Sequence, residues 1–388
     1  MKLQHDLAAL LPRLADGDVY KFCVWYQRYA PHLPTIARVL YDRLDGEEQA
    51  RFLVWFLKKW ANVNLTNPVE CGLYNDAVKR MREQERPPLE LNGKRYGLLD
   101  CSPLGWDIEL LCYDWVTAVC GMLYDQYEHG KVRLAPGDVI IDAGAFIGDT
   151  SVLFHQKLAG QCQIHSFELL DENLALMVHN LERNGVAQDQ VVLNKLALAD
   201  KTGEEIVMDL GAQQAAGSIF GKSEVGERIQ TVTLDDYVVS LGLRKVDFIK
   251  MDIEGAEVLA LKGAHRTIQL FKPRLAICLY HKWDDMFTIP QAILATGVDY
   301  DFSFRWVEMT HGWEAILFAL PASPTSHHPA TSVAATDHIA DALDALTASV
   351  VKNFRQSEAM YRHIKRLEKA EADANDAGSE SVESDRGS

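Results

Sequence analysis

Short β-branched runs alternate with helical stretches between residues 131 and 321, and no other feature of the chain limits its fold as much. Strands separated by helices are typical of a mainly parallel sheet that helices cover on both faces. The first run, DVIID, is apolar in its middle, as expected of a strand buried on both faces. We therefore predict a doubly wound α/β fold, with strands at 138–142, 163–167, 190–194, 246–250, 274–280, 299–305 and 314–320.

The segment before this region has a different pattern. Apolar side chains recur there at helical spacing, for example at Phe22, Cys23 and Tyr26. Such a stripe is typical of a helix that buries one face. A helical N-terminal domain is therefore predicted over residues 1–130, followed by the α/β domain over residues 131–321.

Three further segments follow the α/β region. Residues 322–335 are rich in Pro, Ser, Thr and His, which indicates a linker. Residues 336–373 carry apolar side chains at alternating spacings of four and three, which predicts a coiled-coil-like helix. This helix would either pair with a second copy, giving a homo-oligomer, or pack on its own chain. Residues 374–388 hold almost no large apolar side chain and are expected to form a disordered acidic tail.

Composition narrows the class of protein. A formal net charge of −16 repels phosphate backbones, so a nucleic-acid partner is not expected. The seven cysteines include no C-x-x-C spacing, which indicates neither a disulfide framework nor a zinc site. No apolar run approaches the roughly 20 residues that cross a bilayer, and no signal-peptide pattern opens the chain. We therefore expect a cytoplasmic protein without a membrane span.

The strongest local signal follows the first strand, in VIIDAGAFIGDT. Glycine at this turn lets the backbone approach a ligand closely, at the sheet edge where open α/β sheets bind ligands. The G-x-x-x-G spacing differs from the dinucleotide fingerprint, and the acids of the loop suit a cationic ligand better than a pyrophosphate. S-adenosylmethionine, which has an ammonium, a sulfonium and no phosphate, is the cofactor that fits. We expect Asp142 to orient the ammonium, and Thr150 and backbone amides to bind the carboxylate. The full set of expected contacts is Asp142, Ala143, Gly144, Phe146, Gly148, Asp149 and Thr150.

The next two strand ends supply the rest of the predicted cofactor site. Glu168 ends the second strand, where an acid accepts hydrogen bonds from ribose hydroxyls. Leu169 follows it in the chain. The third strand should end near the adenine, so Asn194 and Ala197 are the expected contacts there, with Leu196 as the alternative apolar contact.

A second acidic strand end lies in DFIKMDIEGAE. Asp252 and Glu254 would face the same crevice as Asp142, because the fourth strand of a doubly wound sheet neighbours the first. Carboxylates gathered in one crevice need an offsetting cation, protonation or solvent. The sulfonium cofactor would be one such cation and a divalent metal another, so metal use stays open. Glu257 is expected to be an acid that complements a helix N-terminus.

The fifth strand leads into LYHKWDD. A histidine just past a strand end on the ligand side is a reasonable general base, so His281 is the first candidate and Asp252 the second. Glu254 would orient the base or bind the acceptor. The weaker candidates on the acceptor side are Ser218, Asp235 and Trp283.

Taken together, VIIDAGAFIGDT, HSFE, VTLDDY, DFIKMDIEGAE and LYHKWDD resemble the FkbM-type methyltransferases over residues 131–320. The resemblance implies a seven-stranded sheet whose last strand is antiparallel, S-adenosylmethionine as methyl donor, and a hydroxyl acceptor on a sugar, glycan, polyketide or other secondary metabolite. The family usually has Asn after Gly-Ala in the loop, where this chain has Phe146. The resemblance therefore implies no polar contact between the side chain of Phe146 and the cofactor.

Three alternatives remain at this point. An N-methyltransferase on the same cofactor site would also suit the acidic crevice. A nicotinamide-dependent dehydrogenase is disfavoured by the G-x-x-x-G spacing. A scaffold protein that keeps the fold without turnover is suggested by the helical segment and the heptad pattern, whereas the retained acidic positions favour an enzyme.

Overall fold

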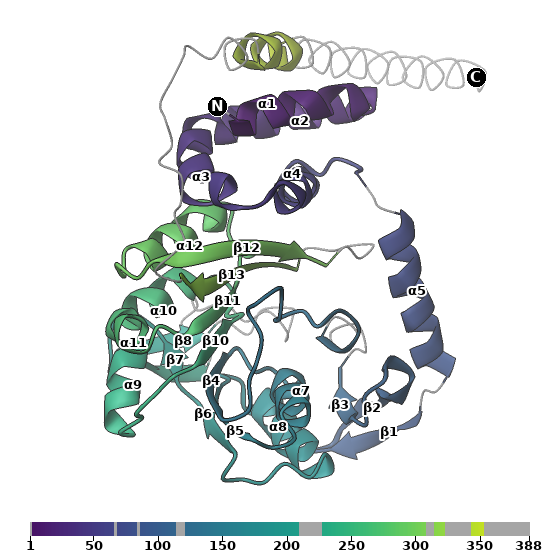
Figure 1. The fold of residues 1–388 in the computed structure, drawn as a ribbon. Coiled ribbons are helices and arrows are strands. Elements are labelled where there is room, and N and C mark those ends of the chain that lie inside the picture. The colour runs from purple at the N-terminus through teal and green to yellow at the C-terminus, as the bar shows by residue number, and fades with distance from the viewer. Residues whose placement is uncertain are drawn as a thin grey trace, which may run out of the picture. The chain divides into compact units, whose positions relative to one another are not determined.

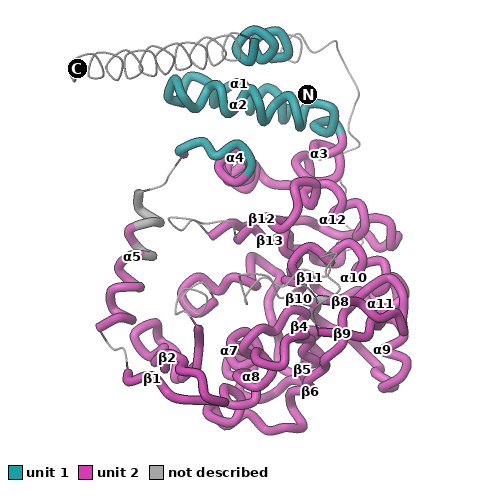
Figure 2. The backbone as a smooth tube through the Cα atoms, turned by 180° about the vertical axis from the view of Figure 1, so that it is seen from behind, with its two compact units in different colours: residues 1–34, 60–64, 333–388 teal, residues 35–59, 65–332 magenta. Residues whose placement is uncertain are grey.

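The computed structural model describes residues 2–65, 68–83, 86–113, 121–208, 227–307, 314–322 and 343–352. These residues form two compact units, which Figure 2 shows in different colours. Residues 2–34, 60–64 and 343–352 belong to the first unit, and the other described residues belong to the second. The division does not fall at residue 130, because the described helices of the N-terminal segment are shared between both units.

A seven-stranded sheet organises the second unit (Figure 1). The strand order is β12-β13-β11-β10-β4-β5-β6. The strands are β4 (Asp138–Ala143), β5 (Cys162–Phe167), β6 (Val191–Asn194), β10 (Phe248–Met251), β11 (Arg274–Cys278), β12 (Tyr300–Trp306) and β13 (Ala315–Pro321). Six of them run in the same direction, and β13, which lies between β11 and β12, is antiparallel to both. The predicted fold class is confirmed, and each of the seven predicted strands is present.

Helices cover both faces of this sheet (Figure 1). The helices α7 (Asp149–Lys157) and α8 (Asp171–Arg183) lie on one side. On the other side lie α9 (Leu234–Ser240), α10 (Glu257–Gly263) and α11 (His265–Phe271), and α12 (Asp285–Leu294) contacts α10. The strands between them are apolar: every residue of β4 is buried. This double cover explains why β4 has no exposed face.

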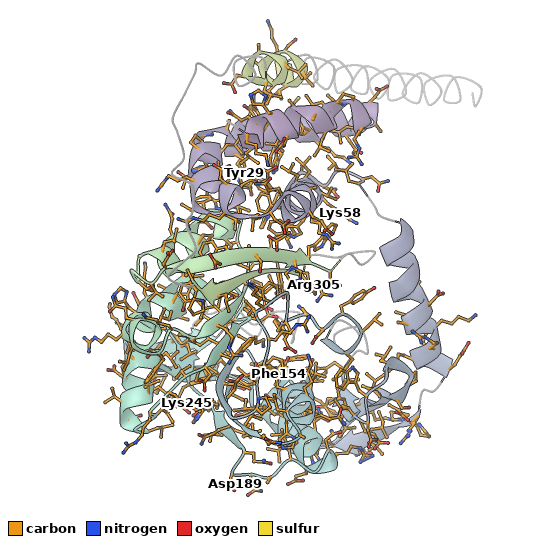
Figure 3. The ribbon with its side chains drawn as sticks, in the orientation of Figure 1. Tyr29, Lys58, Phe154, Asp189, Lys245 and Arg305 are labelled. Atoms are coloured by element: carbon orange, nitrogen blue, oxygen red, sulfur yellow. The ribbon has the colours of Figure 1, made fainter. Side chains whose placement is uncertain are left out.

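Aromatic packing fills the interior between sheet and helices. Phe154 of α7 meets Phe248 of β10 edge to face, with ring centroids 5.9 Å apart. In Figure 3, Phe154 lies among packed side chains, whereas Asp189 and Lys245 lie at the periphery of the unit. The core therefore sits on both faces of the central strands, and polar side chains collect at their ends.

The N-terminal segment is helical only in part. Its helices are α1 (Lys2–Leu10), α2 (Asp16–Tyr29), α3 (Leu33–Val39), α4 (Gly46–Ala61) and α5 (Pro68–Glu83). An antiparallel sheet of β1 (Arg86–Leu91), β2 (Lys94–Asp100) and β3 (Glu109–Cys112) follows, so the prediction of helix was wrong here. The overlooked signal is Asn92-Gly93, since both residues have positive φ, as a tight two-residue hairpin turn requires.

A second small sheet lies between β6 and β10. It consists of β7 (Ala197–Leu198), β8 (Glu205–Met208) and β9 (Glu227–Val232), in the order β7-β9-β8. Its strands were not predicted. Two-residue and four-residue strands such as β7 and β8 are too short for periodicity to reveal.

The predicted linker and acidic tail lie outside the described residues, as does most of the heptad segment. Residues 343–352 are helical and belong to the same compact unit as α1 and α2. Their buried positions are Leu343, Thr347 and Val351, whereas Leu346 of the predicted heptad seam is 38% exposed. The buried stripe thus passes through a polar residue, and self-association through this helix stays a prediction. Among the described helices, none is long and apolar enough to cross a membrane.

Candidate active site

The carboxyl ends of β4, β5 and β10 meet at one edge of the sheet. Ala143, the last residue of β4, is level with Phe167 of β5 on one side and with Met251 of β10 on the other. The chain then leaves all three strands at the same height. Gly144, Glu168 and Asp252 therefore emerge beside one another, which is where the sequence analysis placed the site.

The glycine loop is fixed by its contact with the end of β10. Gly144 has a φ of +77°, and a Cβ at this position would lie 1.8 Å from the carbonyl oxygen of Asp252. No other residue type fits there. Phe146 has a φ of +49°, in the left-handed region that Asn tolerates better than Phe does. This backbone conformation gives a physical reason for an Asn at the equivalent position of similar proteins.

Asp142 lies under this loop and is fully buried. Ser151 Oγ donates a hydrogen bond of 2.6 Å to Asp142 Oδ2, and Lys250 Nζ lies 3.0 Å from Asp142 Oδ1. A carboxylate paired in this way has its charge compensated by the protein itself. The structure thus gives Asp142 a role in holding the loop, whereas the sequence analysis expected it to orient the ammonium of the cofactor.

Lys250 is the cation of this group, and sequence reasoning did not select it. Its Nζ also donates a hydrogen bond of 2.6 Å to Gly144 O and lies 5.0 Å from the centre of the Tyr127 ring. Burial lowers the pKa of Lys250, but the charges of Asp142 and Asp252 outweigh burial and raise it. A lysine inside an otherwise apolar strand was the available signal, because a buried lysine requires a partner.

Glu168 links the glycine loop to α8. Its carboxylate accepts four hydrogen bonds, from the backbone amides of Phe146, Leu169 and Leu170 and from Asn173 Nδ2, at 2.9 to 3.1 Å. Burial raises the pKa of Glu168, and these hydrogen bonds oppose that effect. All four donors are neutral, so they orient the carboxylate without cancelling its charge. Glu168 therefore remains a centre of negative charge at this edge.

An aromatic pair lies beside Glu168. The Tyr113 ring is 5.8 Å from the Phe146 ring, and Tyr113 Oη donates a hydrogen bond of 2.9 Å to Asn173 Oδ1. Asn173 in turn donates to Glu168. The small sheet β1-β2-β3 thus contributes, through the residue just after β3, to the surroundings of the loop. Sequence reasoning missed Tyr113, because its role depends on a sheet that was not predicted.

The other predicted cofactor residues lie at the same strand ends. Asp149 and Thr150 open α7 and are buried, and burial raises the pKa of Asp149 to about 6 even though Lys250 opposes it. Asn194 ends β6, and its side-chain amide donates hydrogen bonds of 3.1 Å to two carbonyls of β5 and β6. Ala143 and Gly148 belong to the loop, Leu169 is half-buried, and Ala197 is buried at the start of β7.

Asp252, the first residue after β10, accepts hydrogen bonds from two tyrosines. Tyr127 Oη lies 2.7 Å from Asp252 Oδ2, and Tyr280 Oη lies 3.0 Å from Asp252 Oδ1. His281 Nε2 is 3.2 Å from the same Oδ1. Burial raises the pKa of Asp252, but the hydrogen bond and charge of His281 and the charge of Lys250 together hold it well below its usual range.

His281 lies between carboxylates. Its Nδ1 is 2.9 Å from Glu257 Oε1, and its Nε2 is 3.2 Å from Asp252 Oδ1 and 3.8 Å from Glu254 Oε2. Burial lowers the pKa of His281, but the hydrogen bonds and charges of Asp252 and Glu257 raise it well above its usual value. Glu257 also accepts a hydrogen bond of 2.9 Å from Ile253 N. Sequence reasoning gave Glu257 only a helix-end role and missed its contact with His281.

Further acids surround this group. Burial raises the pKa of Glu254, of Asp285 and of Glu314 to about 7 each. Lys59 of α4 lies near them and opposes the effect at Glu254 and Glu314. We use the name acidic cluster for Asp252, Glu254, Glu257, His281, Asp285 and Glu314.

One part of the acidic cluster has the composition of a metal site. Ligand-type atoms of Glu257, His281 and Asp285 lie within 4.8 Å of one another. The hydrogen bond between Glu257 and His281 Nδ1 already occupies one of these atoms, and Asp285 accepts one of 2.6 Å from Lys282 N. We therefore assign no metal to these three residues.

Of the weaker acceptor candidates, Asp235 and Trp283 lie within the described residues. The Asp235 carboxylate accepts hydrogen bonds of 3.0 and 2.7 Å from Arg266 N and Thr267 N, and so caps the start of α11. Trp283 is half-buried, with its ring 5.8 Å from that of Phe287. Ser218 lies outside the described residues.

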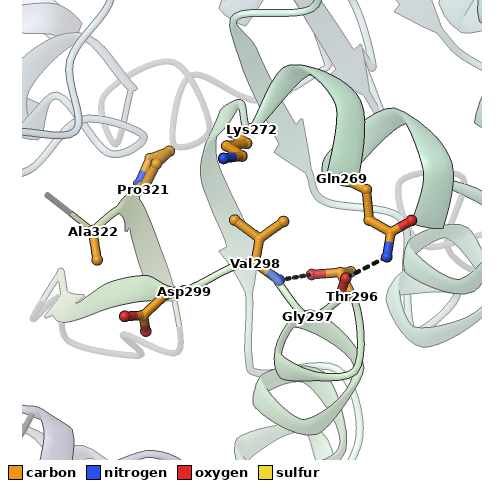
Figure 4. A pocket seen from close by; sticks show the side chains of 8 residues that line it. All are labelled: Gln269, Lys272, Thr296, Gly297, Val298, Asp299, Pro321 and Ala322. Carbon is orange, nitrogen blue, oxygen red and sulfur yellow. Dashed lines mark hydrogen bonds between the residues drawn. The ribbon is translucent and has the colours of Figure 1, made fainter. Parts of the chain in front are cut away.

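A surface hollow of about 350 Å³ lies elsewhere on the second unit (Figure 4). Lys272, which precedes β11, and Asp299, which precedes β12, both line it. These positions are at the amino ends of their strands, opposite the edge that carries the glycine loop. The hollow is therefore separate from the candidate active site.

Part of the chain is similar to known methyltransferases. Residues 142–320 match the family model described as the methyltransferase FkbM domain. The 31-O-demethyl-FK506 methyltransferase FkbM of Streptomyces tacrolimicus is 26% identical over 167 residues, covering 35% of this chain and 62% of that protein. The methyltransferase FkbM from Methylobacillus flagellatus KT superposes with a TM-score of 0.48 and 21% identity, covering 76% of this chain and 60% of that one.

A further solved structure is an O-methyltransferase from Bacillus cereus in complex with SAH. Its TM-score is 0.32 and its identity 12%, covering 47% of this chain and 74% of that one. The chain thus spans less than two thirds of both FkbM proteins, with 62% and 60% of their lengths covered. Residues 142–320 of this chain are thus similar to the methyltransferase FkbM domain.

Proposed function

We propose that this chain transfers a methyl group from S-adenosylmethionine to a hydroxyl of a sugar, glycan or secondary metabolite. The main observation behind this proposal is that two different acidic sites, Glu168 and the acidic cluster, lie at the same edge of the sheet. Glu168 keeps its charge beside the glycine loop, and the acidic cluster lies at the end of the neighbouring strands. The similar protein from Streptomyces tacrolimicus is named as an O-demethyl-FK506 methyltransferase, which supports an oxygen acceptor.

The residues at the glycine loop fit the cofactor. Glu168 is a buried carboxylate held by neutral donors, so it suits ribose hydroxyls and a nearby positive charge. Asp142 and Lys250 compensate each other and would keep the loop in shape. When bound, S-adenosylmethionine supplies an electrophilic methyl group. The residues that would hold it are Asp142, Ala143, Gly144, Phe146, Gly148, Asp149, Thr150, Glu168, Leu169, Asn194, Ala197 and Asp252.

The acidic cluster would serve the acceptor. An alcohol is a poor nucleophile at neutral pH, so the site must remove its proton as the methyl group is transferred. The chain's own contribution is to align the hydroxyl with the methyl group and to receive that proton. Asp252, Glu254 and His281 are the candidates to align the hydroxyl and to receive its proton.

Calorimetric titration with S-adenosylmethionine and with S-adenosylhomocysteine tests the cofactor. We expect Glu168→Gln to weaken binding by about tenfold to a hundredfold, as the loss of a hydrogen bond to a charged group does. Glu182→Gln, an exposed acid on the same α8, is the matched control and should bind like the unchanged protein. No binding of either compound to the unchanged protein would favour the scaffold alternative.

The acceptor is tested by mass spectrometry of products after incubation with labelled S-adenosylmethionine. The acceptors would be 31-O-demethyl-FK506, a panel of glycosides and a panel of amines. A methyl group on oxygen supports the proposal. A methyl group on nitrogen would replace it with the N-methyltransferase alternative.

A further inference from the structure

The geometry of the acidic cluster points to Glu254, not His281, as the residue that takes the proton from the acceptor hydroxyl. We propose that Asp252 and Glu257 hold His281 as an imidazolium, and that this cation positions the carboxylates around it. The inference rests on the proposed methyl transfer, because it assigns a role within that reaction. It changes the expectation from sequence, in which His281 was the base.

The first step of the argument is the proton count on His281. A neutral imidazole has one N–H donor and one bare nitrogen. Both nitrogens of His281 face carboxylate oxygens, Nδ1 at 2.9 Å from Glu257 and Nε2 at 3.2 Å from Asp252. His281 Nε2 approaches Asp252 as an ion pair and not with hydrogen-bond geometry. A bare nitrogen beside a carboxylate would still set two lone pairs against each other, so the doubly protonated ring is favoured at both contacts. An imidazolium has no lone pair with which to accept a proton.

The second step eliminates the two partners of His281. Glu257 is completely buried, and its Oε1 is engaged by His281 and by Ile253 N. Asp252 is engaged on both oxygens, by Tyr127, Tyr280 and His281. Protonation of Asp252 would disrupt contacts that the cluster already makes. Glu257 Oε2 makes no hydrogen bond among the described residues, but it is buried and therefore out of reach of an acceptor.

The third step concerns the availability of Glu254. Its side chain is 37% exposed, against 18% for Asp252 and 7% for His281. Among the described residues, none donates a hydrogen bond to it. Its backbone has a φ of +54°, a left-handed conformation that is costly for Glu and is often found at functional sites. This strained turn directs the chain between Asp252 and Glu257.

Charged groups from several elements set the proton affinity of Glu254. They are His281 after β11, Asp252 after β10, Glu257 of α10, Lys59 of α4 and Glu314 before β13, with Lys282 packed against the neighbouring Gly255. Burial is the largest effect and raises the pKa of Glu254 to about 7, with His281 and Lys59 opposing it and the acids adding to it. A base with this pKa is matched to proton transfer near neutral pH.

The reaction step then balances. The acceptor O–H bond breaks and its proton goes to a Glu254 oxygen. The oxygen lone pair forms the new O–CH₃ bond as the CH₃–S bond breaks. The electron pair of the broken bond returns to sulfur, which changes from a sulfonium to a neutral thioether. No oxidant, reductant or metal is required.

Nuclear magnetic resonance with isotope-labelled histidine tests the protonation state of His281. The signal is assigned by its disappearance in His281→Gln. We expect both ring nitrogens to stay protonated as the pH rises through about 6.5, where an ordinary histidine becomes neutral. Glu257→Gln should lower the pH at which the ring titrates, because it removes one of the two carboxylates that raise the pKa of His281. A neutral His281 at pH 7 in the unchanged protein would overturn the proposal.

The role of Glu254 is tested with isotope-labelled glutamate and with turnover. We expect a carboxyl signal, absent in Glu254→Gln, that titrates near neutral pH. With an acceptor found by the product assay, Glu254→Gln should lower the methyl-transfer rate by about a hundredfold to ten-thousandfold while cofactor affinity changes less than twofold. Glu182→Gln should change neither. A Glu254 signal that titrates near pH 4, or full activity of Glu254→Gln, contradicts the proposal. Absence of cofactor binding in the unchanged protein would instead refute the proposed function, and the role of Glu254 in it, whatever the titration shows.

Discussion

Acids at the ends of two neighbouring strands have different numbers of compensating cations in this protein. Asp142 near the end of β4 is paired with Lys250 and with Ser151, and we call these three residues the closed group. It contains one acid and one cation. Asp252 just after β10 shares His281 with Glu254 and Glu257, and we call these four residues the open group. It contains more acids than cations. The comparison shows that an acid at a strand end becomes structural or reactive according to its counter-charge. The position alone does not decide this.

Removing the cation from the closed group should have the largest effect. Lys250→Met leaves Asp142 buried without its ion-pair partner, and we expect a loss of about 3–5 kcal/mol in the free energy of unfolding. Urea unfolding followed by circular dichroism measures it. The double variant Lys250→Met/Asp142→Asn should recover part of this loss, because no unpaired charge is then buried. A cost below about 1 kcal/mol for the single variant would show that the two groups do not differ as described.

Changing the pH should affect the open group next. The pKa of His281 is raised above its ordinary value of 6.5, so its proton stabilises the folded state fully below that pH, and this stabilisation is lost as the pH rises through the raised value. We therefore expect the difference in unfolding free energy between the unchanged protein and His281→Gln to be largest below pH 6.5 and to shrink at alkaline pH. Thermal unfolding across a pH series measures it. A difference that grows with pH would contradict an imidazolium in the folded state.

The loop that joins the two groups should show the smallest effect. Phe146→Asn places a residue that tolerates positive φ in a left-handed position, which relieves a strain of about 1–2 kcal/mol. It also removes the ring contact with Tyr113, which opposes that gain. We expect a net change within about 1 kcal/mol, whereas Phe146→Ala loses the ring without gaining that tolerance and should cost more. Equal destabilisation by both variants would show that the backbone of Phe146 is not strained.

The strands of the central sheet could be predicted because their signal is local. DVIID at β4 is buried on both faces and is therefore apolar in its middle, which is visible in a few residues. The small sheet β1-β2-β3 was missed for a related reason. Its Asn92-Gly93 turn follows a long segment with apolar residues at helical spacing, and that pattern masks the shorter strand signal.

The sequence by itself therefore determined the sheet, the edge at which the acids collect and the residue types available there. Only the tertiary structure decided which acid receives which partner. Asp252 meets Tyr127 across 125 residues of chain, and Lys250 meets the glycine loop across 106. The physical reason is that strand formation depends on near neighbours in the chain, whereas the charge state of a buried group depends on whatever folding brings within a few ångströms of it.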